Sequence, residues 1–135
     1  MTDDFYAAIG GHATFDRIVR RFYDGVKTDP ILRPMYPEDD LDGAIWRLTA
    51  FLEQYWGGPS TYSDQRGHPR LRARHQAFRI DDTARDHWLA HMTAAVMAEG
   101  LAPLHHETLM DYLDRAAHAM VNTISDIERD DRTML

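Results

Sequence analysis

One histidine stands inside the most basic stretch of the chain. Residues 70–80 read RLRARHQAFRI, with four arginines around His75. On a helix, Leu71 and Phe78 would share an apolar face with His75. Burial and nearby cations both disfavour a charged imidazole, and a neutral imidazole can bind a metal ion. A core histidine that donates to a backbone carbonyl is the alternative, and the local sequence leaves both interpretations open.

The arginines themselves indicate an anionic ligand. Six of the 15 Lys and Arg residues lie between Arg66 and Arg85, in a chain whose net charge is −7. Arginine suits planar carboxylates and phosphates, because its donors bind them in pairs. Non-specific nucleic-acid binding needs a basic surface, so we expect no nucleic-acid partner. A helical domain that contacts phosphates with the same arginines is the alternative.

Aromatic side chains with a polar tip form a second candidate group. An inward-facing Tyr or Trp needs a hydrogen-bond partner, and several of them together would make a polar spot inside an apolar cavity. Ordinary core packing is the alternative for any one of them. The residues concerned are Tyr23, Tyr36, Tyr55, Trp56, Tyr62 and Trp88.

Two further histidines, His87 and His91, have the i, i+4 spacing of a helical metal site in the stretch HWLAH. No glutamate follows His87, so the metalloprotease pattern is absent. Both residues flank Trp88, which the apolar pattern places inward. We therefore expect the two histidines to face solvent.

Helices must position these residues. Apolar side chains recur with helical period in four segments, and Gly or Pro punctuates their ends. Thr14 is the expected N-cap of the first long helix, and Asp81 or Asp82 caps the third. Residues 57–70 read as a loop, and Pro69 can open a short helix over 70–76. The four expected long helices are 14–28, 41–56, 82–99 and 104–124, after a short turn at 4–9.

The composition indicates one globular domain. A chain of 135 residues, 44% of them hydrophobic, is long enough to bury a core. With no cysteine, the chain has no disulfides and no thiolate metal site, which fits a cytoplasmic protein. No apolar run is long enough to span a membrane, and the acidic N-terminus is no signal peptide. We expect a domain over residues 1–124 and a charged, disordered tail over 125–135.

Three blocks of sequence resemble a known family. FLEQYWGGP (51–59), YSDQRGHPRLRARHQAF (62–78) and YPEDDL (36–41) are similar to the group II truncated haemoglobins. The resemblance extends from about Phe5 to Asn122. It implies an all-α fold, the truncated globin's two-over-two helical sandwich around haem b.

The resemblance also implies roles for individual residues around the haem. His75 would be the proximal ligand of the iron, and its other ring nitrogen would donate to a backbone carbonyl. Leu48 and Phe78 would lie in the haem pocket. The candidates to bind the haem propionates are Arg47, Tyr62, His68, Arg72 and Arg74.

On the distal side, Tyr23, Tyr36 and Trp88 match the polar trio of the family. Ala44 stands where many globins have a histidine, so the donors would be two phenols and an indole. Donors to bound O₂ imply tight binding and slow release, with NO and CO as further ligands. Oxidation of NO or a peroxidase-type reaction would need a separate reductase, and a gas sensor without turnover is the alternative. The oligomeric state stays open.

Overall fold

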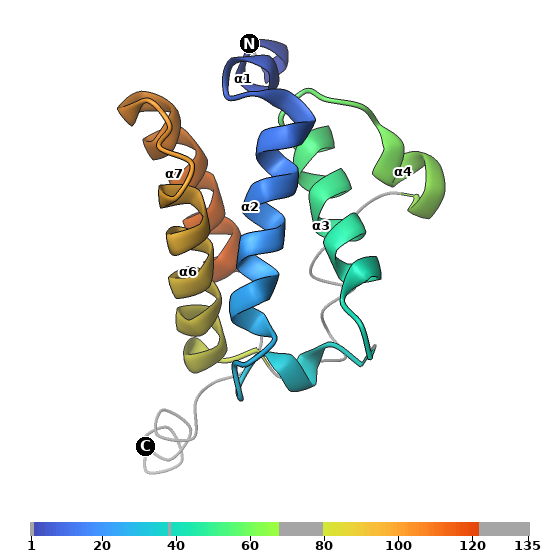
Figure 1. Cartoon of the computed structure of the whole chain (residues 1–135), viewed down its shortest axis with the longest axis vertical. Helices are drawn as coiled ribbons and strands as arrows, with labels where there is room; N and C mark the ends of the chain where they lie inside the picture. Colours follow the sequence, from blue (N-terminus) through green and yellow to red (C-terminus); the bar gives the residue numbers. More distant parts are fainter. Residues whose placement is uncertain (1, 38, 68–79, 122–135) are drawn as a thin grey trace, which may run out of the picture.

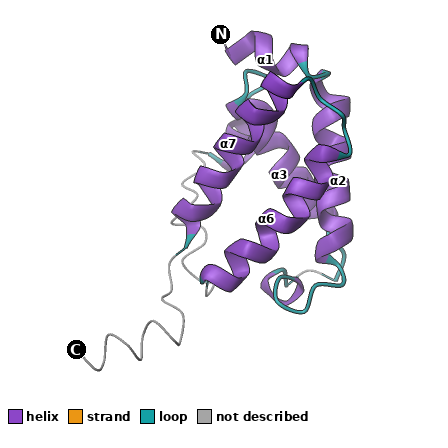
Figure 2. Ribbon diagram, turned by 90° about the vertical axis from the view of Figure 1, so that its left-hand side faces the viewer, coloured by secondary structure: helices purple, strands orange, loops and turns teal. Residues whose placement is uncertain are grey.

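The computed structural model describes residues 2–37, 39–67 and 80–121. Every element in these ranges is helical, with no strand among them (Figures 1 and 2). This confirms the all-α prediction. The elements are α1 (Thr2–Ala8), α2 (Gly11–Val26), the 3-10 helix η1 (Arg33–Met35), α3 (Asp42–Tyr55), α4 (Thr61–Arg66), α6 (Asp82–Met97) and α7 (Pro103–Met120).

Helix α2 lies at the centre of the packing. It contacts α6 on one side and α3 on the other, and α6 in turn packs on α7 (Figure 1). The predicted apolar stripe of α2 is buried along its whole length. Burial of each such side chain stabilises the fold by about 1.5–3 kcal/mol. The stripe consists of Phe15, Ile18, Val19, Phe22 and Val26.

The start of α2 differs from the prediction. The helix begins at Gly11, and Thr14 lies inside its first turn instead of capping it. The Thr14 hydroxyl donates to the Ile9 carbonyl oxygen at 2.6 Å. Gly10 makes the sharp turn from α1 with φ of 114°, a conformation that favours glycine. A Cβ at Gly10 would lie 2.2 Å from the Thr14 hydroxyl oxygen, so the turn also needs glycine for space.

The start of α6 agrees with the prediction. Asp81 has extended backbone, and its side chain accepts a hydrogen bond from the Ala84 backbone N–H at 3.0 Å. This satisfies one of the amides that a helix start leaves without a partner. The first turn of α6 is therefore held in place one turn before Trp88.

The segment predicted as a loop over residues 57–70 contains the short helix α4. Two hydrogen bonds connect it to α3: the Gln54 amide nitrogen donates to the Ser63 hydroxyl at 2.7 Å, and the Ser63 backbone N–H donates to the Gln54 amide oxygen at 2.9 Å. A helix this short is unstable in isolation. Contacts with α3 therefore stabilise it, and local sequence does not reveal them.

Three predictions concern residues outside the described ranges. They are the short helix over 70–76, the last residues of the final helix beyond Val121, and the charged tail over 125–135. Within the described part, α7 ends at Met120. None of the described helices combines the length and apolar character needed to cross a bilayer.

Candidate functional site

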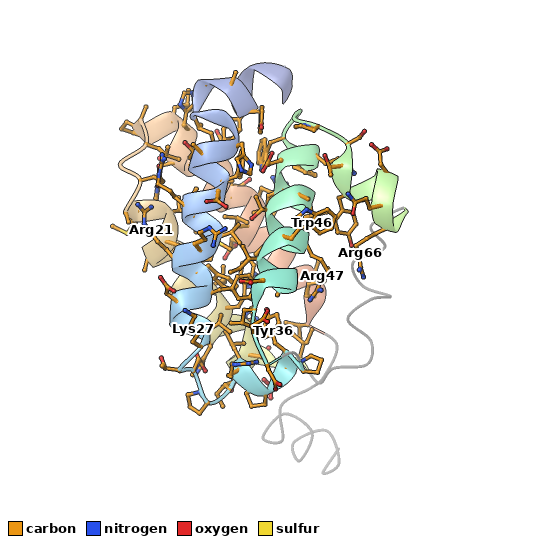
Figure 3. All side chains as sticks on the ribbon, turned by 45° about the vertical axis from the view of Figure 1, so that its right-hand side comes forward. Arg21, Lys27, Tyr36, Trp46, Arg47 and Arg66 are labelled. Atoms are coloured by element: carbon orange, nitrogen blue, oxygen red, sulfur yellow. The ribbon has the colours of Figure 1, made fainter. Side chains whose placement is uncertain are left out.

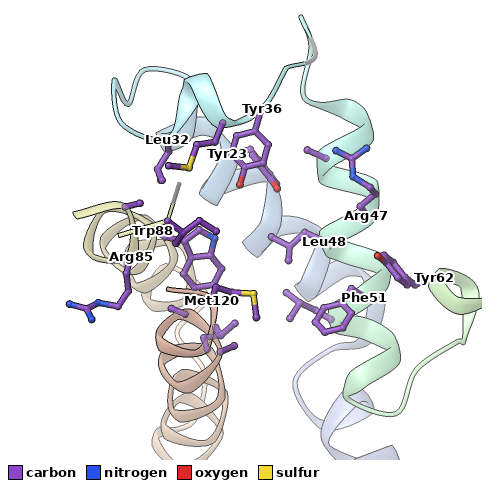
Figure 4. Close-up of a pocket in the computed structure, with 18 of the residues that line it drawn as sticks. Tyr23, Leu32, Tyr36, Arg47, Leu48, Phe51, Tyr62, Arg85, Trp88 and Met120 are labelled. Atoms are coloured by element: carbon purple, nitrogen blue, oxygen red, sulfur yellow. The ribbon is translucent and has the colours of Figure 1, made fainter. Parts of the chain in front are cut away.

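A cavity of about 490 Å³ lies between α3 on one side and α6 and α7 on the other (Figure 4). This volume is typical of sites for cofactors and other small molecules, which range over about 300–1,000 Å³. Most of the wall is apolar, so the cavity suits a ligand with a large apolar surface. Apolar side chains in the wall include Leu32, Met35, Leu48, Phe51, Leu113 and Met120.

Three polar aromatic residues face one end of the cavity. Tyr23 comes from α2, Tyr36 follows η1, and Trp88 comes from α6. The rings of Tyr23 and Tyr36 meet at 86° with centroids 5.4 Å apart. In Figure 4 the two phenol oxygens lie close together and face the space between Trp88 and Leu48. Hydrogen-bond donors from three separate segments thus converge on one part of an apolar cavity.

Phe22 positions two members of this trio. Its buried ring contacts Tyr23 with a centroid distance of 4.9 Å and Trp88 with one of 5.3 Å. Phe22 belongs to the core stripe of α2, so the same packing that joins α2 to α6 orients the phenol and the indole. Tyr23 itself is only 4% exposed.

The face of α3 toward the cavity carries small and apolar side chains. Ala44 and Leu48 both line the cavity, one helical turn apart. Ala44 is buried, and its methyl group supplies no hydrogen-bond donor. This part of the wall therefore leaves space for a ligand, while the donors come from α2, α6 and the segment after η1.

Arginines supply positive charge at the cavity. Arg47 lines it, as predicted, and so does Tyr62. Figure 3 shows Arg47 and Arg66 on the same side of the molecule, near α4. Arg66 and Arg85 also line the cavity, although they were not among the predicted ligand contacts. In the sequence, only the high density of arginines over residues 66–85 indicated that they could contact a ligand. Guanidinium groups here can bind carboxylates of a ligand.

The other predicted ligand contacts lie outside the described residues. They are His68, Arg72, Arg74, His75 and Phe78. The segment that contains them joins two residues of the cavity wall, Arg66 and Ile80. Within the described ranges, no three metal-binding side chains gather into a site for a metal ion.

His87 and His91, which were expected to face solvent, are only partly exposed and contact a buried carboxylate. His87 Nδ1 lies 2.8 Å and His91 Nε2 lies 2.7 Å from Oδ2 of buried Asp29. The backbone N–H groups of Ile31 and Leu32 donate to Oδ1 of the same carboxylate. Burial alone would raise the pKa of Asp29, but these four hydrogen bonds outweigh it and hold the pKa well below its usual range. The sequence did not show this contact because Asp29 is 58 residues from His87.

Two further aromatic residues lie at the end of α3 and in α7. Tyr55, one of the polar aromatic candidates named from the sequence, is 49% exposed, and sequence reasoning missed Tyr112. Its ring stacks on Tyr112 with centroids 4.0 Å apart, and Tyr112 lines the cavity. Burial, and then the neighbouring Tyr55, raise the pKa of Tyr112 to about 12, so its phenol keeps its proton at neutral pH.

Comparisons with known proteins agree with this architecture. Residues 4–122 match the model of the family described as "Bacterial-like globin". The group 2 truncated haemoglobin YjbI of Bacillus subtilis is 39% identical over 117 residues, which cover 87% of each chain. A thermostable haemoglobin from Thermobifida fusca is 58% identical, with a TM-score of 0.86 over 87% of this chain and 96% of that one. A structure described as a truncated oxygen-avid haemoglobin from Bacillus subtilis has a TM-score of 0.82 at 39% identity, covering 87% of this chain and 98% of that one.

The cavity fits the cofactor of this family. Haem is a flat, largely apolar ring with two carboxylates at one edge, and the cavity combines apolar walls with arginines. The family match spans most of the chain, and the relatives cover nearly the same length. The chain therefore belongs to the bacterial-like globins as a group II truncated haemoglobin, and its cofactor is haem b.

Proposed function

We propose that this protein binds O₂ tightly and releases it slowly. The observation that supports this is the convergence of Tyr23, Tyr36 and Trp88 on one part of the cavity. When haem is bound, its iron supplies the O₂-binding centre. Bound O₂ attracts hydrogen-bond donors, because negative charge develops on it. The Bacillus subtilis relative described as oxygen-avid supports the same function.

The donors determine the size of the expected effect. A hydrogen bond to a charged group contributes about 1.5–3 kcal/mol. Two donors at about 2 kcal/mol each change the affinity about a thousandfold. Within one site, such differences appear mainly in the dissociation rate. A protein with this pocket retains O₂ and is a poor carrier.

We further propose how the chain holds the haem. His75 would bind the iron as its proximal ligand, and Leu48 and Phe78 would lie in the haem pocket. Arg47 and Tyr62 line the cavity and are candidates to bind the propionates. Five more residues are candidates for the same role. Arg66 and Arg85 also line the cavity, and His68, Arg72 and Arg74 belong to the segment outside the described residues.

Replacement of a donor tests the proposal on O₂. Trp88→Phe and Tyr23→Phe should each speed O₂ release about 10- to 30-fold, because each loses one donor of about 1.5–2 kcal/mol. Stopped-flow mixing with an O₂ scavenger measures the rate. Tyr6→Phe is the control, because its hydroxyl donates to Glu53 away from the cavity. Unchanged rates in both variants would refute the role of these donors.

Replacement of His75 tests the proximal ligand. His75→Ala should bind haem more weakly or change the absorption spectrum of the ferrous form, and added imidazole should restore the original spectrum. The measurement is a spectrum of the ferric and ferrous protein. A purified wild-type protein that stays colourless after addition of hemin would contradict the haem assignment itself.

NO and CO are the other proposed ligands. Oxidation of NO by bound O₂ would join the two into nitrate and require one electron from a separate reductase for each turnover. A sensor that binds the same gases without turnover is the alternative. An assay of NO consumption by the O₂-bound form separates the two, because a sensor consumes no more than one equivalent. A cytoplasmic location is also a prediction, which cell fractionation tests.

A further inference from the structure

A second, smaller pocket of about 130 Å³ lies on the face of α3 that points away from the haem cavity. Leu48, which lines the haem cavity, lies on the other face of the same helix. The start of α2, the segment before α4 and the start of α4 complete the wall of the small pocket. Four residues of α3 line it at the i, i+3, i+4 and i+7 positions of one helix face: Trp46, Thr49, Ala50 and Glu53.

Thr49 contributes a polar group that lacks a partner. The residue is only 5% exposed, and its hydroxyl oxygen has no hydrogen-bond partner within the described part of the chain. A threonine hydroxyl inside a helix commonly bonds to the backbone carbonyl one turn earlier. A buried hydroxyl without any partner lowers the stability of the fold. An occupant of the pocket with a hydrogen-bond donor would supply the missing bond.

Glu53 contributes a negative charge to the same pocket. Its side chain is only 9% exposed. The Tyr6 hydroxyl donates to Oε2 at 3.1 Å, and His12 Nδ1 lies 2.7 Å from Oε1. Each oxygen of a carboxylate has two lone pairs, so each can accept one more hydrogen bond. The carboxylate is therefore held in position and can still accept from a ligand.

We propose that this pocket binds a small primary alkylammonium ion, a function separate from gas binding at the haem. Such an ion carries one positive charge and three N–H donors, which match the carboxylate of Glu53 and the hydroxyl of Thr49. The Trp46 side chain lines the pocket and is partly exposed, so its indole can attract the cation and pack against the alkyl chain. The net charge of −7 also favours the approach of cations.

The same groups predict which related molecules bind poorly. An alcohol of the same size has a donor but no charge, so it leaves the charge of Glu53 without a counterion. A quaternary ammonium ion has the charge but no N–H group, so it leaves the Thr49 hydroxyl without a partner. The small volume of the pocket restricts the alkyl chain to a few carbon atoms.

The experiment is a calorimetric titration of the haem-bound protein with propylammonium chloride at neutral pH, where a primary amine is protonated. One ion should bind to each chain. Propan-1-ol and tetramethylammonium should bind at least about tenfold more weakly. An amine nitrogen can also bind haem iron, so an absorption spectrum is recorded at each step. The Soret band should stay unchanged.

Glu53→Gln tests the charge, and Asp42→Asn is its matched control. Glutamine retains the shape and the acceptor oxygen of Glu53, and the variant should bind propylammonium at least about tenfold more weakly. Asp42→Asn removes the same charge from an exposed position in the first turn of α3, outside the pocket. Its affinity should equal that of the wild type. Circular dichroism checks that both variants are folded.

Thr49→Val tests the hydroxyl with a second measurement. The variant should bind propylammonium about three- to tenfold more weakly. Without the ion, it should unfold at a higher temperature than the wild type, because a methyl group replaces a buried hydroxyl that lacks a partner. A hydroxyl that serves only the structure of α3 would predict a lower unfolding temperature instead.

Several results would overturn the proposal. They are the absence of propylammonium binding, equal affinity in Glu53→Gln and the wild type, equally tight binding of propan-1-ol, and a shift of the Soret band that accounts for all of the binding. A lysine side chain carries the same ammonium group, so tighter binding of Nα-acetyl-lysine amide than of propylammonium would overturn the assignment to a free amine. The proposals on haem and O₂ would stand in each case.

Discussion

Two buried carboxylates connect the same pair of helices, one near each end of their contact. Asp29 follows α2 and binds His87 and His91 of α6. Glu99 follows α6 and binds Arg17 and Arg21 of α2. In both cases the partners are four residues apart on one helix face, and the carboxylate side chains are only 4% and 6% exposed. The geometry is similar, but the chemistry of the partners differs.

The difference lies in the partners and in what else each carboxylate holds. Arginine stays charged at every physiological pH, whereas histidine as a residue type titrates near neutrality. Asp29 also accepts hydrogen bonds from the backbone of Ile31 and Leu32, and Leu32 lines the haem cavity. Glu99 makes no contribution to the cavity wall. We infer that Glu99 joins two helices, whereas Asp29 joins them and also shapes the wall of the ligand site.

The largest effect is expected from Asp29→Ala. This change removes the acceptor of four hydrogen bonds and should lower the free energy of unfolding by about 3 kcal/mol. O₂ release should change as well, because Leu32 and Trp88 both lie in the cavity wall. Denaturant unfolding followed by circular dichroism and stopped-flow kinetics measure the two effects.

Asp24→Ala is the control for this variant. The Asp24 side chain is 71% exposed, and its ion pair among the described residues is a surface contact with Lys27, so its loss should cost less than about 0.5 kcal/mol. Unchanged O₂ release in the Asp29 variant would mean that Asp29 does not shape the cavity wall. Asp29 would then act as Glu99 does, by joining the two helices alone.

Glu99→Gln should have a smaller effect, confined to stability. The loss of negative charge weakens the pairs with Arg17 and Arg21, but both arginines are partly exposed and remain hydrated. We expect a decrease of about 1–2 kcal/mol in the free energy of unfolding. O₂ release should be unchanged. A shift in O₂ release similar to that of Asp29→Ala would show that helix packing alone controls the cavity.

Acid should reduce the stability that both Asp29 and Glu99 contribute. Hydrogen bonds from His87 and His91 lower the pKa of Asp29 against the effect of burial, and the hydrogen bond from Arg17 lowers that of Glu99. A carboxylate with a lowered pKa stabilises the fold fully above its unfolded pKa of about 4, and this stabilisation is lost as the pH falls further. The wild type should therefore lose more stability between about pH 5 and about pH 3 than Asp29→Asn does. Parallel pH profiles for the two proteins would contradict this account.

The smallest effect is expected from Arg20→Ala. Arg20 lies between the two arginines that bind Glu99, but it faces Asp16 at 3.0 Å on the surface of α2. An exposed i, i+4 pair contributes about 0.3–0.5 kcal/mol. A thermal or denaturant scan should show a change no larger than this. If Arg20→Ala lowered the free energy of unfolding as much as Glu99→Gln does, the position of an arginine on α2 would not determine how much it contributes to stability.

The cavity shows how far sequence reasoning reaches. The residues to which the family resemblance gives a role at the haem line this cavity wherever the structure describes them; their roles toward haem and O₂ remain predictions. The helical period identified the inward faces of α2, α3 and α6, because buried apolar residues recur with the period of the helix. Tyr36 and Tyr62 were named from the family resemblance and not from this period. The residues with such a role that line the cavity are Tyr23, Tyr36, Ala44, Arg47, Leu48, Tyr62 and Trp88.

The errors share one physical cause. His87 and His91 were expected in solvent because the carboxylate that binds them is far away in the sequence. Helix α4 was expected to be a loop because side-chain contacts from Gln54 stabilise it. Each depends on a contact between distant segments, and helical periodicity reports only on neighbours along one helix.

The sequence by itself determined the all-α fold, the family and the inward faces of the long helices, because these depend on local period and on long distinctive blocks of residues. Only the tertiary structure decided which polar groups meet. Asp29 and the histidines of α6, Glu99 and the arginines of α2, and the stacked rings of Tyr55 and Tyr112 all come from different elements. Hydrogen bonds and ring contacts require a distance of a few ångströms, and only the folded chain brings these groups that close.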